Sequence, residues 1–195
     1  MIVLDRSPAR TFLEGLAGEL PAKPSAVVVI SAHYEALVTS ITSGAHPSTI
    51  HDFGGFPPAL CQMRYVAPGS PKLAERIQTM LDSADIPSRL DSQRGFDHGT
   101  WTPLILAWPA ADIPVVQISI NERATPQTHY NLGVVLGALR EENILIIGSG
   151  SMTHNLSAFF RGNYGSDAPV EPWVDHFLDW VDASLATGDH AAVLR

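Results

Sequence analysis

Three short runs of apolar, mostly β-branched residues constrain the fold of this chain more than any other feature. They occupy residues 26–31, 114–120 and 143–148. Runs of this kind are typical of strands that are buried on both faces of a parallel sheet. Helical patterns lie before and between them, and three of these patterns begin with Ser or Thr followed directly by Pro, a common helix start. The alternation predicts an α/β fold with a mostly parallel central sheet flanked by helices.

The periodicity of apolar residues places the individual elements. We expect strands over residues 26–31, 37–42, 114–120 and 143–148, a short strand after Pro87, and helices over residues 8–20, 71–81, 101–108, 125–140 and 172–186. Residues 44–70 are rich in Gly and Pro and predict a long loop, which in a compact domain is usually functional or disordered. Its aromatic residues Phe53, Phe56 and Tyr65 favour an ordered, functional loop. A second, shorter loop is predicted over residues 95–99.

Length and composition bound the class of protein. The 195 residues suffice for a core, and residues 1–195 are predicted to form a single domain. The net charge of −8 argues against a nucleic-acid partner, because phosphate contacts need basic side chains. No apolar stretch approaches the ~20 residues that span a bilayer, and no signal peptide is visible, so no membrane partner is expected. The single cysteine, Cys61, excludes an internal disulfide and fits a cytoplasmic protein.

Four histidines stand out because each follows an apolar run or lies in a Gly- and Pro-rich loop. They are His33, His51, His98 and His154. Ligands and reactive groups of α/β proteins collect in such places, and histidine is suited both to metal ligation and to proton transfer near neutral pH. The pattern therefore indicates one shared site. The other histidines lie in polar or amphipathic segments and are interpreted as surface residues: His46, His129, His176 and His190.

Position alone leaves a structural alternative open for each of the four. His33 is compatible with a metal ligand and with a capped structural histidine. His98 and His154 are compatible with acid–base groups and with rings tied down by local hydrogen bonds. Asp97 either assists the site or fixes the loop backbone. His51 either contacts a ligand or stabilises a turn.

Several other motifs are missing from the sequence. Residues 148–152 follow a predicted strand with Gly-Ser-Gly-Ser-Met but match neither GxGxxG nor the P-loop, which argues against nucleotide binding. No GxSxG elbow is present for a serine nucleophile. The sequence also contains no HExxH and no paired-cysteine zinc pattern.

Six segments in order along the chain carry a family resemblance. They are Val-Val-Ile-Ser-Ala-His33-Tyr, Thr-Ile-His51-Asp-Phe-Gly-Gly-Phe-Pro, Tyr-Val-Ala-Pro-Gly-Ser-Pro71, Gly-Phe-Asp-His98-Gly-Thr-Trp-Thr-Pro-Leu, Ile-Pro-Val-Val-Gln-Ile-Ser-Ile120 and Gly-Ser-Gly-Ser-Met-Thr-His154-Asn-Leu. Together they cover nearly the whole chain. The sequence resembles the class III (LigB-type) extradiol ring-cleavage dioxygenases, in their 4,5-DOPA dioxygenase extradiol-like branch.

The resemblance implies an enzyme that opens the aromatic ring of a catechol with O₂ at a mononuclear non-haem Fe(II) site. Zinc is recorded in the same site of some family members, and imidazole ligands suit both metals. The site residues are then expected to be His33 as metal ligand, His98 and His154 as catalytic acid–base groups, and His51, Asp97 and Phe53 as substrate-binding residues. The expected partners are a small catecholic molecule and O₂.

The family pattern also contains segments that this chain lacks. Members carry His-Gly-Ser-Pro at the end of a first strand and a further ligating histidine near the other end, so we expect a domain truncated at both ends, with His33 as the one family ligand. The alternative is a truncated, non-catalytic homologue that acts as a binding module without a complete metal site. A metal-dependent hydrolase is disfavoured, because the sequence offers no bridging carboxylates for a two-metal site. Loss of an inner strand would expose a sheet edge, which favours a homo-oligomer.

Overall fold

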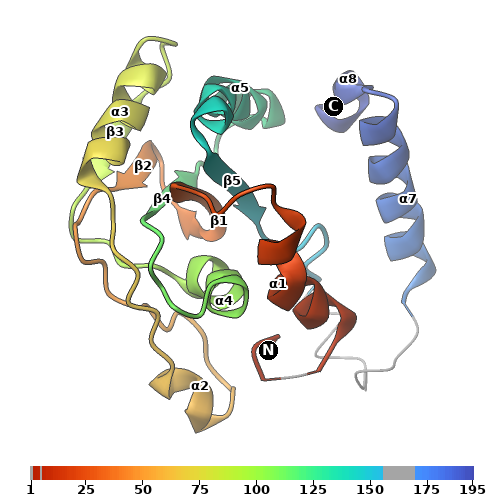
Figure 1. Cartoon of the computed structure of the whole chain (residues 1–195). Coiled ribbons are helices and arrows are strands. Elements are labelled where there is room, and N and C mark those ends of the chain that lie inside the picture. Colours follow the sequence, from red (N-terminus) through yellow and green to blue (C-terminus); the bar gives the residue numbers. More distant parts are fainter. Residues whose placement is uncertain (1, 5, 156–169) are drawn as a thin grey trace. The chain divides into compact units, whose positions relative to one another are not determined.

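The computed structural model describes residues 2–4, 6–155 and 170–195, and the chain divides into two compact units, Met1–Gly150 and Ser151–Arg195. The first unit contains a five-stranded sheet with the order β3-β2-β4-β1-β5 (Figure 1). β1 pairs in parallel with β4 and with β5, β2 pairs in parallel with β3, and the β2–β4 pair is antiparallel. The strands are β1 (Ala26–Glu35), β2 (Thr39–Thr42), β3 (Ser88–Asp91), β4 (Val115–Ile120) and β5 (Ile144–Ser149).

Helices cover both faces of this sheet, as predicted. α1 (Pro8–Glu19) and α4 (His98–Ala107) pack on one face, and α3 (Pro71–Asp82) and α5 (Pro126–Leu136) pack on the other (Figure 1). Three of the four begin as the sequence predicts, with a Ser or Thr hydroxyl that accepts a hydrogen bond from the first helical turn and a Pro just after it. The predicted α/β class with a mostly parallel central sheet is therefore confirmed.

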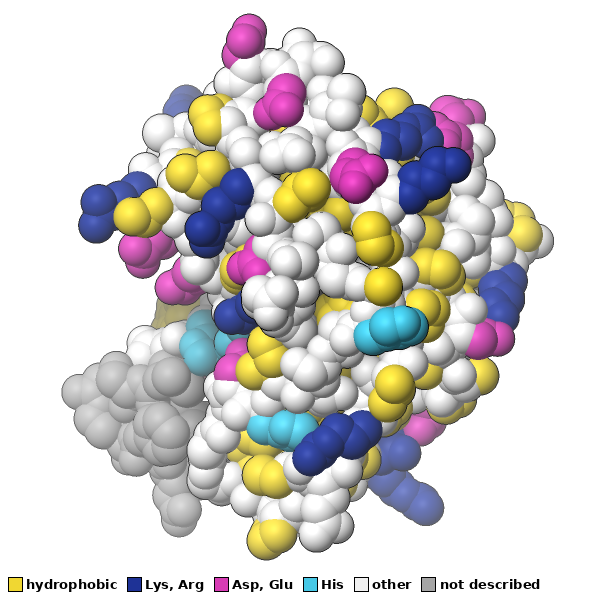
Figure 2. All heavy atoms as spheres, turned by 90° about the vertical axis from the view of Figure 1, so that its left-hand side faces the viewer, with side chains coloured by type: hydrophobic (Ala, Val, Ile, Leu, Met, Phe, Trp, Pro, Cys, Tyr) yellow, Lys and Arg dark blue, Asp and Glu magenta, His cyan; other side chains and the backbone are white. Residues whose placement is uncertain are grey.

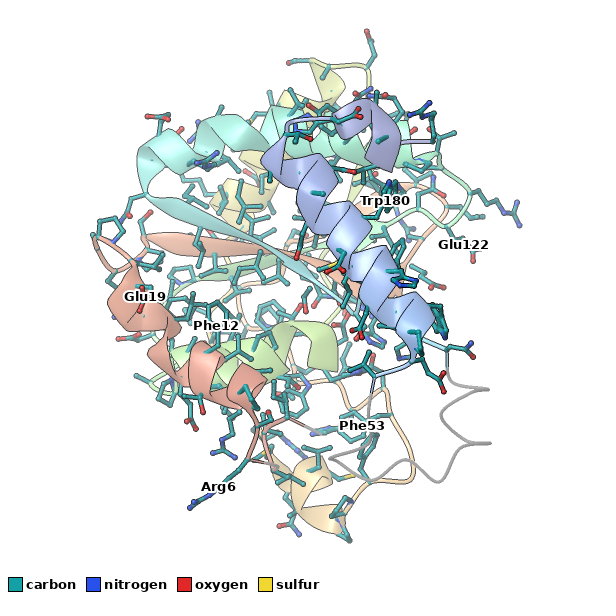
Figure 3. The ribbon with its side chains drawn as sticks, turned by 90° about the vertical axis from the view of Figure 1, so that its right-hand side faces the viewer. Arg6, Phe12, Glu19, Phe53, Glu122 and Trp180 are labelled. Atoms are coloured by element: carbon teal, nitrogen blue, oxygen red, sulfur yellow. The ribbon has the colours of Figure 1, made fainter. Side chains whose placement is uncertain are left out.

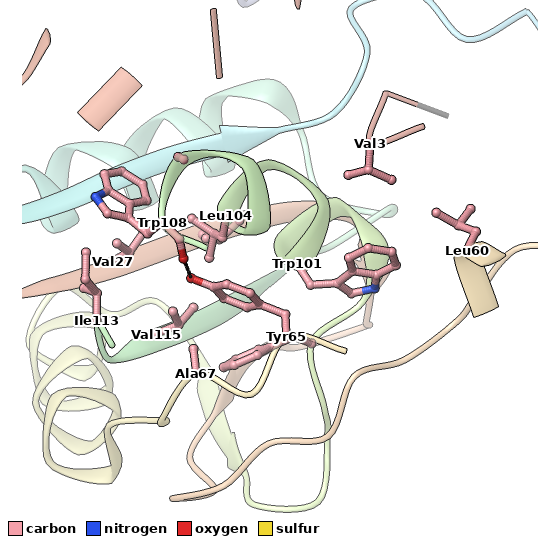
Figure 4. Packing of buried hydrophobic residues seen from close by; sticks show 13 residues of the cluster. Val3, Val27, Leu60, Tyr65, Ala67, Trp101, Leu104, Trp108, Ile113 and Val115 are labelled. Atoms are coloured by element: carbon pink, nitrogen blue, oxygen red, sulfur yellow. Dashed lines mark hydrogen bonds between the residues drawn. The ribbon is translucent and has the colours of Figure 1, made fainter. Parts of the chain in front are cut away.

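Alternating side chains along β1 contribute to two hydrophobic clusters, one on each face of the sheet. Val27 and Val29 pack in the cluster beneath α1 and α4, together with Trp101 and Leu104 (Figure 4). Val28 packs in the opposite cluster, beneath α3 and α5. All three valines are completely buried, and each buried side chain contributes about 1.5–3 kcal/mol relative to an exposed one. This two-sided burial explains why the run contains no polar alternation.

The long segment between β2 and α3 closes the first of these clusters. Tyr65 is buried there, and its hydroxyl donates a hydrogen bond of 3.3 Å to the carbonyl oxygen of Trp108 (Figure 4). Burial, together with the charge of Asp112, raises the pKa of Tyr65 to about 12. The sequence predicted a loop over the whole segment. The structure differs, because the segment contains the short helix α2 (Pro58–Gln62).

Three boundaries differ from the sequence expectation. β1 continues past its predicted end and contains His33. α4 begins at His98 rather than in the tryptophan segment that follows, because the side chain of Asp97 caps it. The helix predicted over residues 125–140 changes to a 3₁₀ helix over Gly137–Glu142. Two of these differences concern candidate site residues.

The second unit contains α7 (Pro172–Ala186), as predicted, and the short helix α8 (His190–Val193), which the sequence did not indicate. Figure 3 shows Trp180 on α7, where its side chain is 44% exposed. None of the helices in the described residues has the length and apolar character needed to cross a bilayer.

The surface carries charges of both signs. On the face shown in Figure 2, basic side chains lie beside acidic ones instead of gathering in one patch. Cys61, the single cysteine of the chain, is exposed.

Candidate active site

His33 lies where β1 becomes irregular. β1 pairs with β4 in regular register as far as Ser31, and the pairing resumes at Glu35 after a shift. Bulges of this kind redirect side chains and are common beside active sites. The side chain of His33 is 36% exposed, so that solutes can reach it.

His98 is the first residue of α4, and its neighbour Asp97 is the helix cap. The carboxylate of Asp97 accepts a hydrogen bond from the backbone N–H of Thr100 at 3.2 Å. This cap turns the chain sharply at the start of the helix. The turn fixes the backbone position from which the side chain of His98 projects. That side chain is 18% exposed.

The loop that precedes α2 is tied to the segment that precedes α4. Thr49 forms an isolated parallel bridge with Phe96. Gly95 permits the two segments to approach, since a Cβ at that position would lie 2.2 Å from the carbonyl oxygen of Ser48. Asp52 follows Thr49 closely in the loop. The bridge therefore places Asp52 near the start of α4.

The structure brings His33, Asp52 and His98 together from three separate segments. One potential ligand atom of each residue lies within 4.8 Å of the other two. Nδ1 of His98 lies 2.8 Å from Oδ1 of Asp52, and Nδ1 of His33 lies 3.9 Å from Oδ2 of the same carboxylate. The centroids of the two imidazole rings are 3.9 Å apart. Two of the four histidines singled out in the sequence therefore share one place.

Asp52 holds His98 through two hydrogen bonds. Both the backbone N–H and ring Nδ1 of His98 lie within hydrogen-bond distance of Oδ1 of Asp52, at 3.1 and 2.8 Å. Burial alone would raise the pKa of Asp52, but the hydrogen bonds from His98 outweigh burial, and the pKa is lowered. Because an ionised carboxylate only accepts hydrogen bonds, Nδ1 of His98 is the donor in this bond, and Nε2 is the ring nitrogen that remains to exchange a proton.

Sequence reasoning missed Asp52 as a functional residue, although it selected both neighbours, His51 and Phe53. A signal was present, because Asp52 is a carboxylate in a loop that already held predicted site residues. Only the pairing of that loop with the segment before α4 shows which histidine the carboxylate reaches.

Phe53 provides an aromatic neighbour for His98. The two rings meet edge to face, with centroids 5.5 Å apart and an interplanar angle of 88°. Phe53 makes a similar contact with Phe56, at 5.6 Å. Figure 3 shows Phe53 on the loop before α2. An exposed edge of such rings suits packing against a flat aromatic molecule.

His51 is engaged within its own part of the loop. Its Nε2 lies 3.0 Å from the carbonyl oxygen of Met63 and 3.2 Å from Nη1 of Arg64. Its ring centroid lies 5.8 Å from that of Trp101. These contacts join the loop to the residues after α2, which favours the turn-stabilising interpretation of His51.

Asp97 is 0% exposed. Ser31 Oγ donates to Oδ1 at 2.7 Å, Arg94 Nη2 donates to Oδ2 at 3.2 Å, and Gln117 Nε2 also donates to Oδ2. The sequence prediction counted Asp97 among substrate-binding residues. This carboxylate has no exposed surface for a substrate to reach, and both of its oxygens already have donors. The structure therefore favours the alternative, in which Asp97 fixes the backbone.

His154 lies in the second unit, which is described by itself. With Met152, Trp173 and Phe177, among others, it lines a hollow of about 360 Å³. An imidazole beside two aromatic side chains can exchange a proton with a flat ring that packs on them. The meeting of His154 with His33 and His98 stays a prediction.

The chemistry of the clustered donors fits a divalent metal ion. Two imidazoles and a carboxylate are the ligand types of many non-haem Fe(II) sites, and they also suit zinc. His33, Asp52 and His98 supply these donors within reach of one another. A metal ion at His33 would thus lie beside the Asp52–His98 pair.

Gly99 lies where the two histidine-bearing segments approach each other. A Cβ at this position would lie 2.5 Å from Oγ of Ser31 and 3.3 Å from Cδ2 of His33. We expect Gly99→Ala to lower the free energy of unfolding by about 1–3 kcal/mol, because the added methyl group overpacks this contact. Urea unfolding measures the loss.

Gly133→Ala is the matched control for this substitution. Gly133 lies inside α5, where a Cβ would meet nothing within 4 Å. Alanine has the higher helix propensity, so this variant should gain up to about 1 kcal/mol. Equal stabilisation by both substitutions would contradict the close packing at Gly99.

Known proteins match the chain along most of its length. The family described as the catalytic LigB subunit of aromatic ring-opening dioxygenase matches residues 7–191. A 4,5-DOPA dioxygenase extradiol from Beta vulgaris is 42% identical over 195 residues, covering 99% of this chain and 71% of that protein. A protein of the same name from Escherichia coli (strain K12) is 44% identical over 164 residues, covering 84% of this chain and 59% of its own.

A solved structure agrees with these matches. The crystal structure of an uncharacterized protein from Escherichia coli K12 has a TM-score of 0.75 and 37% sequence identity to this chain, and the match covers 93% of this chain and 66% of that one. This chain thus spans about two thirds of the length of the proteins that it matches.

Proposed function

The chain belongs to the family of the catalytic LigB subunit of aromatic ring-opening dioxygenases, and we propose that it opens the ring of a catechol with O₂ by extradiol cleavage. The observation that carries this proposal is the meeting of His33, Asp52 and His98. A metal ligand and a paired acid–base histidine are the two groups that the reaction needs side by side. The relatives named 4,5-DOPA dioxygenase extradiol make DOPA the first catechol to test.

In this proposal His33 holds the metal ion, with the carboxylate of Asp52 and the ring of His98 close by. Bound there, Fe(II) would supply a redox-active centre for the catecholate and O₂. A catechol that binds as its anion must first lose a proton from a hydroxyl group. Nε2 of His98 takes this proton, and the same nitrogen later returns one to the product.

Asp52 supports the proton transfer through its hydrogen bond to His98. The bond of 2.8 Å to Nδ1 holds the ring in the tautomer that leaves Nε2 unprotonated. When Nε2 takes a proton, the carboxylate stabilises the resulting imidazolium. The pair therefore resembles the aspartate–histidine pairs of other acid–base catalysts in its roles.

The remaining predicted residues have supporting roles in the proposal. Phe53 packs against the aromatic ring of the substrate beside His98, and His51 holds the loop that presents Phe53. The acid–base role expected for His154, which lies in the second unit beside Trp173, stays a prediction. The catechol and O₂ are the partners that this arrangement serves.

The decisive experiment uses the purified 195-residue chain loaded with Fe(II) under argon and then exposed to O₂ and DOPA. We expect one O₂ to be consumed for each catechol and a yellow ring-opened product to form. The zinc-loaded chain is the matched control, because zinc has no redox chemistry. If the chain binds Fe(II) in stoichiometric amount but leaves a panel of catechols intact, the proposal is wrong and the non-catalytic binding module is favoured.

A further inference from the structure

The carboxylate of Asp97 joins the two histidine-bearing segments from below. It accepts hydrogen bonds from the side chains of Ser31, Arg94 and Gln117 and from the backbone of Thr100. Burying a carboxylate is costly unless donors and a countercharge replace water. A helix cap alone would be served equally by an uncharged Ser, Thr or Asn. Helix capping alone therefore does not account for a buried carboxylate at position 97.

One set of contacts leads from Asp97 to His33. Oγ of Ser31 donates to Asp97 at 2.7 Å and accepts from the backbone N–H of His33 at 3.2 Å. Nη2 of Arg94 donates to Asp97 at 3.2 Å and to the carbonyl oxygen of His33 at 3.4 Å. The guanidinium of Arg94 also lies over the ring of Tyr34, 4.4 Å from its centroid. The backbone of His33 is thus held at both its N–H and its carbonyl oxygen.

A second set of contacts leads from Asp97 to His98. Asp97 precedes His98 directly, and its carbonyl oxygen accepts from the backbone N–H of Trp101 at 2.9 Å. Its own N–H donates to Oε1 of Gln117 at 3.2 Å, while Nε2 of Gln117 donates back to the carboxylate. Gln117 lies on β4, the neighbour of β1. The start of α4 is therefore locked to the central strands.

We propose that Asp97 is a positioning residue that sets the relative orientation of the His33 and His98 imidazoles. The assignment of those two rings as metal ligand and acid–base group rests on the proposed function. The positioning itself rests on the hydrogen bonds of Asp97 to both segments. Loss of the carboxylate would free the bulge at His33 and the helix start at His98 together.

The first test replaces Asp97 with its isostere. In Asp97→Asn, Oδ1 still accepts from Ser31, but an amide N–H₂ group faces the donors of Arg94 and Gln117. We expect the affinity for Co(II), used as a probe in place of Fe(II), to fall about 10- to 100-fold, as is typical when the support of a metal ligand is lost. The ¹⁵N resonances of both imidazoles, measured without metal, should shift as well.

The double variant Asp97→Asn with Gln117→Glu tests whether the pairing is the cause. It exchanges the amide and the carboxylate between the two positions and keeps the net charge. We expect it to recover part of the lost Co(II) affinity, because the carboxylate at position 117 then accepts from the amide at position 97, whereas Arg94 still faces that amide. No recovery at all would contradict the role of this pairing. Leu136→Ala is the stability control, because Leu136 is buried in the cluster on the opposite sheet face. It should lower the melting temperature and leave the imidazole resonances in place.

The inference is overturned if folded Asp97→Asn keeps the parent's imidazole resonances and Co(II) affinity, or if Leu136→Ala changes them equally. Should Asp97→Asn fail to fold, Ser31→Ala removes one of the two links to His33 and none of the links to His98. It is then expected to shift the resonances of His33 more than those of His98, and equal or absent shifts would overturn the inference. A parent chain that opens no catechol refutes the proposed function, whereas the metal-free resonances still decide the role of Asp97.

Discussion

Replacing His33 with alanine is expected to abolish stoichiometric binding of Fe(II) and, with it, ring opening. Loss of a residue that merely supports a ligand costs about 10- to 100-fold in metal affinity, so loss of the ligand itself should exceed 100-fold. The fold should survive, because the ring of His33 is 36% exposed and leaves little empty space behind. Calorimetric titration with Co(II) and O₂ uptake with Fe(II) and DOPA measure the two losses.

His46→Ala is the control for this variant. His46 is an exposed histidine of the long segment between β2 and α3 and was interpreted from the sequence as a surface residue. Its removal should change neither metal affinity nor O₂ uptake by more than a factor of about two. If His33→Ala binds Co(II) as tightly as His46→Ala does, then His33 is not a ligand and the structural interpretation of this histidine is correct.

The sheet could be predicted from the sequence because each of its central strands carries its own signal. Val27, Val28 and Val29 are buried on alternate faces, so that all three positions must be apolar. The helix starts were predictable for a similar reason, since a cap and a following Pro act within one helical turn. The family resemblance was also visible in the sequence, and the match over residues 7–191 confirms it.

The site geometry could not be predicted in the same way, because it depends on contacts between distant segments. The bulge at His33 exists only in the pairing of β1 with β4. The approach of Asp52 to His98 follows from the bridge between Thr49 and Phe96. The sequence left open whether Asp97 assists the site or fixes the loop backbone. In the structure the cap places the side chain of Asp97 in the core and leaves that of His98 partly exposed.

His98 is the second position at which a large effect is expected. His98→Asn keeps an amide N–H near the place of Nδ1, so that the hydrogen bond to Asp52 can persist while Nε2 is lost. General acid–base groups contribute about 10²- to 10⁴-fold, and kcat should fall by that amount. Affinity for Co(II) should stay within a few-fold of the parent. Part of the activity should return as the pH rises, because the diphenol then loses its proton to solvent.

Asp52→Asn, compared with His98→Asn, separates two interpretations of the cluster formed by His33, Asp52 and His98. In one, His98 is an acid–base group paired with Asp52; in the other, His98 is a metal ligand. An amide at position 52 no longer requires a proton on Nδ1 of His98, so the ring can adopt the tautomer that is protonated at Nε2. Because the ring is still present, kcat should fall less than in His98→Asn, and both variants should retain the metal ion. A loss of metal from His98→Asn as large as that from His33→Ala would contradict the acid–base role, because it would identify His98 as a metal ligand.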